Sequence, residues 1–171
     1  MKSDRRDFLK AIGLATAGYS LSGVLPIVMT RDLLHAKPFF DISLAEFSFA
    51  SELFSGKLTN LDFPAKAKKD FGIDVVEYVS MFFNNKHKDN SYMADLKKRA
   101  ADAGVKNNLI MVDGENLSDL DDDKRKKAVE SHYSWVDAAK FLGCGAIRVN
   151  LGSMNMPGTA EDEAKASVDG Y

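Results

Sequence analysis

The sequence has little of what builds the common metal, redox and nucleotide sites. It has a single cysteine, Cys144, which excludes an internal disulfide, and this residue is interpreted as a small buried thiol with a structural role. There is no CxxC, HExxH, GxGxxG or P-loop pattern. Neither sign of charge dominates, since 23 Lys and Arg stand against 25 Asp and Glu. Nucleic acid and an anionic membrane are therefore not expected as partners, and a neutral small molecule fits better.

What is present is the composition of an ordinary globular domain. Of the 171 residues, 45% are hydrophobic and 28% charged, a balance that excludes a disordered or fibrous chain. One folded domain is the expectation from this length.

The first segment has the layout of an export signal. A basic stretch, Asp4 to Lys10, precedes an apolar stretch, Ala11 to Met29, that is diluted by Gly, Ser and Pro. The basic stretch resembles a twin-arginine signal through Arg5, Arg6, Phe8, Leu9 and Lys10, with Asp4 in place of the usual hydroxyl residue. The resemblance implies a signal peptide over residues 1–36, a mature part over 37–171, a periplasmic location, and no membrane partner beyond the export machinery. An uncleaved anchor stays open, because Leu34-His35-Ala36 is an imperfect cleavage site.

From Phe39 onward, short extended runs alternate with longer helical ones. The predicted strands are Ile42–Phe49, Asp74–Val79, Asn108–Asp113 and Ala146–Leu151. The predicted helices are one that begins near Asp62 with Pro64 in its first turn, Tyr92–Ala103, Asp122–Leu142, and one capped by Thr159. This alternation predicts an α/β fold of repeated βαβ units around a parallel sheet.

Three stretches carry a resemblance to a known family. Phe71 to Tyr78, Ala128 to Cys144 and Ile147 to Asn150 resemble the xylose-isomerase-like TIM barrels, which include sugar phosphate isomerases and epimerases and the endonuclease-four relatives. A complete (β/α)8 barrel needs eight strands. The resemblance therefore implies the N-terminal half of such a barrel, about four βα units, as in a truncated chain.

The resemblance also implies a function for the full-length parent. It would be a metal-dependent sugar (phosphate) isomerase or epimerase, acting through an enediolate on a sugar or polyol. The family's divalent metal is held by residues of the second half, so no catalytic residue and no metal ligand is assigned here, and this fragment alone is expected to be inactive. A non-catalytic periplasmic sugar-binding protein is the alternative, and a metal-dependent nuclease is a weaker third hypothesis.

Four polar residues at strand ends are the predicted substrate-binding residues: Glu77, Asp113, Arg148 and Asn150. In this fold the site lies at the carboxyl ends of the strands, and alternation turns Glu77 and Arg148 toward the barrel axis. Arg148 is expected to be buried or half-buried, and it either binds substrate or pairs with Glu77. Asp113 contacts a sugar hydroxyl or forms an Asx turn, and Asn150 binds substrate or caps a loop. The direction of Glu46 is unresolved.

The sequence also predicts the environments of two histidines and the state of the outer strands of the sheet. His132 lies on the apolar stripe of its helix and is predicted to be packed with one hydrogen bond, whereas His87 lies in a polar loop and is predicted to be solvated. Four parallel strands would leave two edges unpaired, which predicts self-association of the truncated barrel.

Overall fold

Four parallel strands form a single sheet in the order β1-β2-β3-β4. They are β1 (Leu44–Ala45), β2 (Val75–Val79), β3 (Lys106–Met111) and β4 (Ala146–Arg148). The computed structural model describes residues 40–150, 152 and 158–171, so the predicted export segment lies outside the described residues. The parallel pairing of neighbouring strands, with helices between them in the chain, confirms the predicted α/β fold with a parallel sheet.

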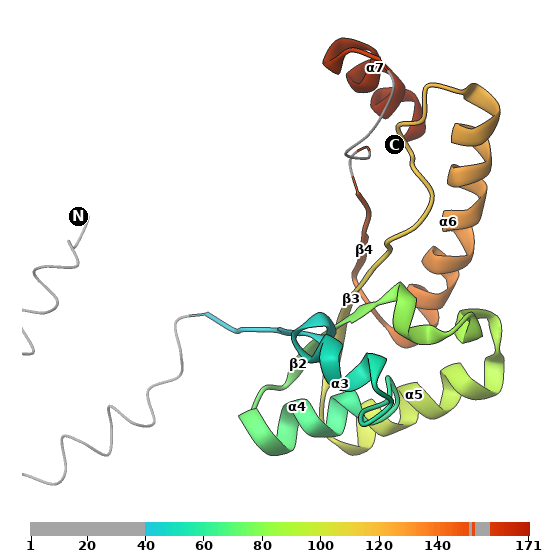
Figure 1. Cartoon of the computed structure of the whole chain (residues 1–171). Helices are drawn as coiled ribbons and strands as arrows, with labels where there is room; N and C mark the ends of the chain where they lie inside the picture. Colours follow the sequence, from blue (N-terminus) through green and yellow to red (C-terminus); the bar gives the residue numbers. More distant parts are fainter. Residues whose placement is uncertain (1–39, 151, 153–157) are drawn as a thin grey trace, which may run out of the picture. The chain divides into compact units, whose positions relative to one another are not determined.

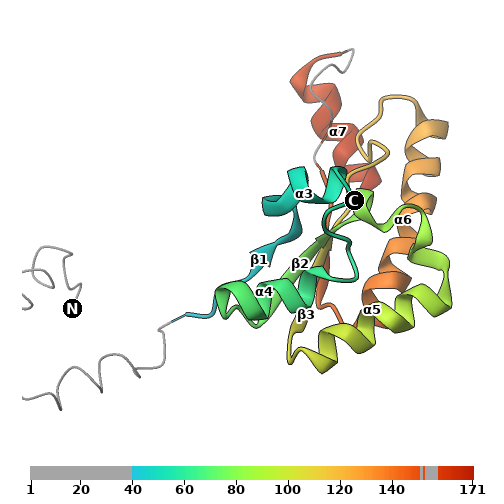
Figure 2. The ribbon, with the colours of Figure 1, turned by 60° about the horizontal axis from the view of Figure 1, so that its bottom comes forward.

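Helices follow each of the first three strands and cover one face of the sheet (Figures 1 and 2). The covering helices are α4 (Phe63–Phe71), α5 (Asn90–Asp102) and α6 (Asp122–Leu142), and α7 (Ala160–Gly170) packs beside α6. The connections contain α3 (Ala50–Phe54) and the 3-10 helices η1 (Glu46–Phe49), η2 (Ser80–Phe83) and η3 (Lys86–Lys88). None of the helices in the described part of the chain is long and apolar enough to cross a membrane.

The core lies between the sheet and these helices. Val76, Tyr78 and Ile110 point toward the helices and are fully buried, as alternation requires. The Tyr78 hydroxyl donates to Asn107 Oδ1 at 2.7 Å, and burial raises the pKa of Tyr78. His132 is buried with its Nδ1 2.7 Å from the Ala128 carbonyl, which confirms a packed histidine. Cys144 is half-buried against the core, and burial raises the pKa of its thiol to about 11.

Local signals place most helix ends. α4 begins after Asp62 with Pro64 in its first turn, and Thr159 forms a capping box with Asp162 at the start of α7. α6 ends at Gly143, whose φ of 80° is a left-handed conformation that favours glycine. These ends confirm the predicted starts near Asp62 and after Thr159.

The first strand is much shorter than predicted. Only Leu44–Ala45 pairs with β2, and the chain then turns into η1 and α3. The prediction of a strand through Phe49 was wrong because the Glu46 side chain replaces the main chain there: its Oε2 accepts the backbone N–H of Val79 at 3.0 Å. A side-chain acceptor can end a strand in this way without leaving the neighbouring donor unpaired.

The pairing of β2 with β3 contains one irregularity. Val76 pairs with Asn107, but the next residue, Glu77, pairs with Leu109, which leaves Asn108 as an extra residue on β3. This is a bulge in a parallel pair. Asn107 is buried on the helix side, and beyond the bulge Ile110 returns to the same side.

Candidate functional site

Three of the four predicted site residues meet at the carboxyl ends of β3 and β4. Asp113 Oδ1 accepts from Arg148 Nη2 at 3.0 Å and from Asn150 Nδ2 at 2.9 Å. Arg148 Nη1 also donates to Asn150 Oδ1 at 3.2 Å. We call Asp113, Arg148 and Asn150 the strand-end cluster.

Backbone contacts fix the position of this cluster. Arg148 is the last residue of β4, and its neighbours Ile147 and Val149 pack on the core, so alternation turns Arg148 to the opposite face. Asp113 follows β3 and is held by Ser80, whose Oγ accepts the Asp113 N–H at 3.0 Å and lies 3.2 Å from its carbonyl oxygen. Ser80 is therefore a positioning residue that the sequence did not indicate.

The cluster borders a hollow on the face of the sheet that lies opposite the covering helices. This hollow has a volume of about 360 Å³ and is lined by Phe47, Val79, Met111, Asp113 and Arg148. The side chains of Arg148 and Asp113 are 48% and 31% exposed. Arg148 thus points to the predicted face but is more exposed than expected, because the pocket is open around it. Charged and polar groups at the rim of an apolar hollow can orient a small polar ligand.

Glu77 does not belong to the cluster, so the suggested ion pair between Glu77 and Arg148 was wrong. Arg148 lies level with Met111 and Val79 across the sheet, two residues beyond Glu77 on β2. The Glu77 carboxylate instead accepts from Ser43 Oγ and from Asn108 Nδ2. The stagger of the strands therefore pairs Arg148 with Asp113.

Among the acidic residues that the structure describes, Glu46 is the most deeply buried. Its side chain is fully buried, and although Oε2 accepts from Val79, Oε1 has no hydrogen-bond partner in the described part of the chain. Burial raises the pKa of Glu46 to about 8. The first predicted strand, Ile42–Phe49, does not alternate cleanly, so no local pattern indicated the direction of the Glu46 side chain.

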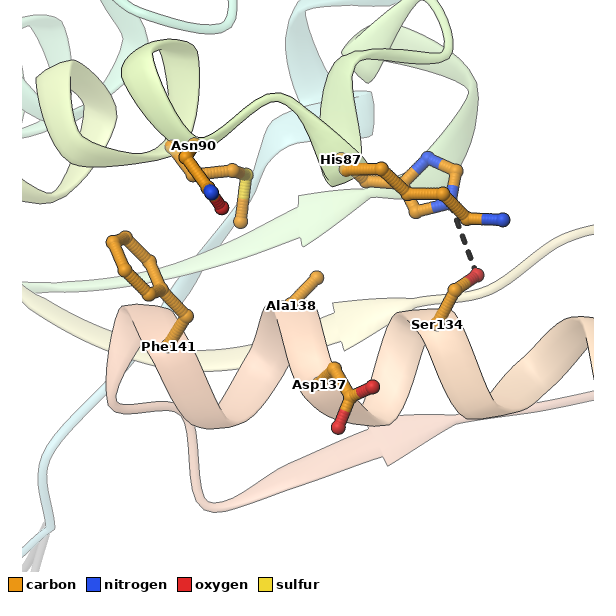
Figure 3. Close-up of a pocket in the computed structure, with 8 residues that line it drawn as sticks. His87, Asn90, Ser134, Asp137, Ala138 and Phe141 are labelled. Carbon is orange, nitrogen blue, oxygen red and sulfur yellow. Dashed lines mark hydrogen bonds between the residues drawn. The ribbon is translucent and has the colours of Figure 1, made fainter.

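His87 is half-buried, contrary to the prediction of a solvated loop residue, and it faces Ser134 of α6 (Figure 3). Its ring stacks on Trp135 with 3.9 Å between centroids, and its Nε2 lies 3.1 Å from Ser134 Oγ. Ser134 Oγ also lies 3.0 Å from the Ser131 carbonyl oxygen, and when it donates there it accepts from Nε2.

The described residues do not fit a divalent metal. No group of three or more His, Cys, Asp or Glu side chains in residues 40–150, 152 and 158–171 is placed to hold one. The one carboxylate of the cluster, Asp113, already accepts from a guanidinium and a carboxamide. The positive charge of the Arg148 guanidinium beside this single carboxylate opposes the binding of a divalent cation.

Comparison with known proteins supports the architecture. No family model matches the sequence, and no curated protein matches it. A solved structure described as D-psicose 3-epimerase in the presence of D-fructose matches with a TM-score of 0.57 and 16% identity. The likeness shows the fold. The match covers 66% of this chain and 40% of the epimerase chain, and the four-stranded sheet corresponds to half of a TIM barrel.

Proposed function

We propose that this chain is the substrate-holding half of a sugar isomerase or epimerase. The strand-end cluster carries the proposal, because it lies beside a hollow at the carboxyl ends of β3 and β4. That end of the strands is where TIM-barrel enzymes bind their substrates. The similar fold of a D-psicose 3-epimerase supports a sugar as the substrate class.

Each member of the cluster has a distinct role in this proposal. The Asp113 carboxylate accepts from sugar hydroxyls, while Arg148 and Asn150 donate to hydroxyl or carbonyl oxygens. Their mutual hydrogen bonds hold the three side chains in place before substrate arrives, which lowers the entropy lost on binding. Both Arg148 and Asn150 donate to Asp113 Oδ1, so within the described part of the chain its Oδ2 is left for a ligand.

The chemistry of the complete enzyme is assigned to no residue of this chain. We propose that proton transfer through an enediolate, and the divalent metal expected with it, depend on groups outside the described residues. The sugar phosphate form of the substrate would add an anion for Arg148 to bind.

Binding of D-fructose tests the proposal. Nuclear magnetic resonance titration should show saturable shifts centred on Asp113, Arg148 and Asn150, and Asp113→Asn should weaken binding at least about tenfold. Asp102→Asn, at the exposed end of α5, is the matched control and should bind like the unaltered chain. Unchanged binding in Asp113→Asn would contradict the proposal.

A non-catalytic sugar-binding protein is the second candidate, favoured by the engagement of Asp113 with two donors. Turnover separates the two candidates. The chain alone should bind sugars without converting them, and adding the remaining half of a barrel should produce turnover only if the enzyme proposal is right. Chelator-sensitive turnover by the chain alone would contradict both assignments.

We also propose export to the periplasm by the twin-arginine pathway. The resemblance of Arg5 and Arg6 to that signal supports it. Replacing both by lysine should retain the protein in the cytoplasm, as measured by cell fractionation, and unchanged export of the double variant would exclude this route. Sequencing the mature N-terminus should place cleavage near Ala36.

A further inference from the structure

A second hollow lies between the connections that follow β1 and β2. It has a volume of about 370 Å³, and its lining includes Phe54, Leu58, Asn60, Phe82, Lys86 and Tyr92. None of its lining residues lines the hollow beside the strand-end cluster. The rings of Phe47 and Phe82, one from each hollow, lie with centroids 6.3 Å apart. We call this second hollow the Asn60 pocket.

The carboxamide of Asn60 is the feature that points to a ligand. Asn60 is 2% exposed, and neither Oδ1 nor Nδ2 has a hydrogen-bond partner in the described part of the chain. The Tyr92 hydroxyl is close enough to influence this carboxamide, but the pair does not have hydrogen-bond geometry. A buried amide with both groups unpaired is costly, so a partner in the pocket that both donates and accepts would stabilise it.

The polar groups of the pocket favour a neutral ligand. An anion could accept from Nδ2 but would leave Oδ1 unpaired, and a cation would do the reverse. Two neighbouring hydroxyls satisfy both atoms, one donating to Oδ1 and the other accepting from Nδ2. Burial raises the pKa of Tyr92 to about 12, so its hydroxyl stays protonated and can serve as a third donor or acceptor.

The rest of the lining suits the carbon skeleton of such a ligand. Phe54 and Phe82 meet edge to face at 5.3 Å, and Leu58 is buried beside them. Lys86 is the only charged residue among those that line the pocket, and its Nζ lies 5.3 Å from the centre of the Tyr92 ring. The lining of the pocket thus combines apolar rings with polar side chains, as a small molecule with a carbon skeleton and several hydroxyls requires, and the volume is sufficient for a monosaccharide.

We propose that the Asn60 pocket is a second binding site, which holds a small neutral polyol through two neighbouring hydroxyls paired with the Asn60 carboxamide. The proposal does not rest on the function proposed for the strand-end cluster, because the two hollows share no residue.

Titration of the full chain with three probes tests the site. D-Fructose, propionamide and sodium propionate are added separately, and the side-chain amide signal of Asn60 and the backbone signals of Phe82 and Tyr92 are followed by nuclear magnetic resonance. D-Fructose should shift these signals saturably and bind more tightly than either other probe. Asn60→Leu, which keeps a branched side chain of similar size, should weaken this binding at least about tenfold.

Two further variants keep the test decisive. Tyr92→Phe keeps the ring and should weaken binding about threefold or more by removing one hydrogen bond. Asp113→Asn changes the other hollow and should leave the shifts at Asn60 unaltered, so failure of either site is seen separately. The proposal is overturned if Asn60→Leu and Tyr92→Phe bind D-fructose like the unaltered chain, if propionamide or propionate binds more tightly, or if no probe saturates and only water occupies the pocket.

Discussion

At the scale of single residues, Glu46 gives the protein a pH dependence of known sign. Its pKa is raised from 4.5 to about 8 by burial, while in the unfolded chain it returns to its ordinary value. Between these two values the folded state binds more protons than the unfolded state. The stabilising contribution of protonated Glu46 is therefore complete below about pH 4.5 and is lost as the pH rises to about 8.

We predict that Glu46→Gln removes this loss of stability at high pH. Glutamine can still accept the Val79 N–H, but it cannot ionise, so the variant should be more stable than the unaltered chain at pH 9 by a few kcal/mol, each pKa unit being worth about 1.4 kcal/mol. Urea unfolding at pH 5, 7 and 9 measures the difference. Glu130→Gln, on the exposed side of α6, is the control and should keep the original slope. Parallel slopes for Glu46→Gln and the unaltered chain would contradict the prediction.

At the scale of elements, two glycines near the end of α6 allow the effect of backbone conformation on stability to be measured separately from the effect of side-chain packing. Gly143 has a φ of 80°, whereas Gly145 does not have a positive φ, and an added Cβ would meet nothing within 4 Å at either position. Any difference between the two alanine variants therefore comes from backbone conformation.

We predict that Gly143→Ala lowers the free energy of unfolding by about 1 kcal/mol, because alanine resists the left-handed conformation. Gly145→Ala should change it by less than about 0.5 kcal/mol. Chemical unfolding of both variants measures the effect. An equal effect of the two substitutions would show that the conformation at Gly143 is not the cause.

The longer helices, α4 to α7, were predictable from local patterns, whereas α3 and the 3-10 helices were not predicted. α6 has the predicted bounds, Asp122 to Leu142, because its cap, its apolar stripe and the glycine at its end are all local signals. The second strand was predicted within one residue, since it is a short apolar run bounded by turn residues. The prediction of the first strand failed because the Glu46 carboxylate accepts the backbone N–H of Val79, 33 residues away, and this contact ends the strand.

The candidate site was only partly predictable for a related reason. Alternation gave the face of Arg148 correctly, but its partner depends on the stagger between strands, which no local pattern contains. Ser80 was missed because a serine after an apolar run is usual at a strand end. Only the tertiary structure shows that it holds the backbone of Asp113.

At the scale of the whole molecule, the sheet has two strands with one neighbour each. In the described part of the chain, β1 pairs only with β2, and β4 pairs only with β3. The face of the sheet opposite α4, α5 and α6, which bears Met111, has no covering helix there (Figures 1 and 2). Parallel sheets normally have both faces covered, and open edges pair readily with other strands.

We therefore predict that the isolated chain self-associates, with a second four-stranded unit completing the sheet. Light scattering after size-exclusion chromatography should give a mass above the 18.8 kDa of one chain. Met111→Lys, on the open face, should reduce association, whereas Ala94→Lys, on the exposed side of α5, should not. A monomer with one cooperative unfolding transition would contradict this prediction.

The bulge at Asn108 allows β3 to lose one residue without changing which face its later side chains occupy. In a regular strand, loss of one residue turns every later side chain to the opposite face. Loss of Asn108 would instead restore regular pairing and leave Ile110 and Met111 facing as they do now, while loss of Ile110 would move Met111 into the core. Chains that lack Asn108 should fold, and chains that lack Ile110 should not, as circular dichroism and thermal unfolding can show. Relatives of this protein can therefore differ by one residue in the middle of a buried strand and still align face for face on either side of the gap.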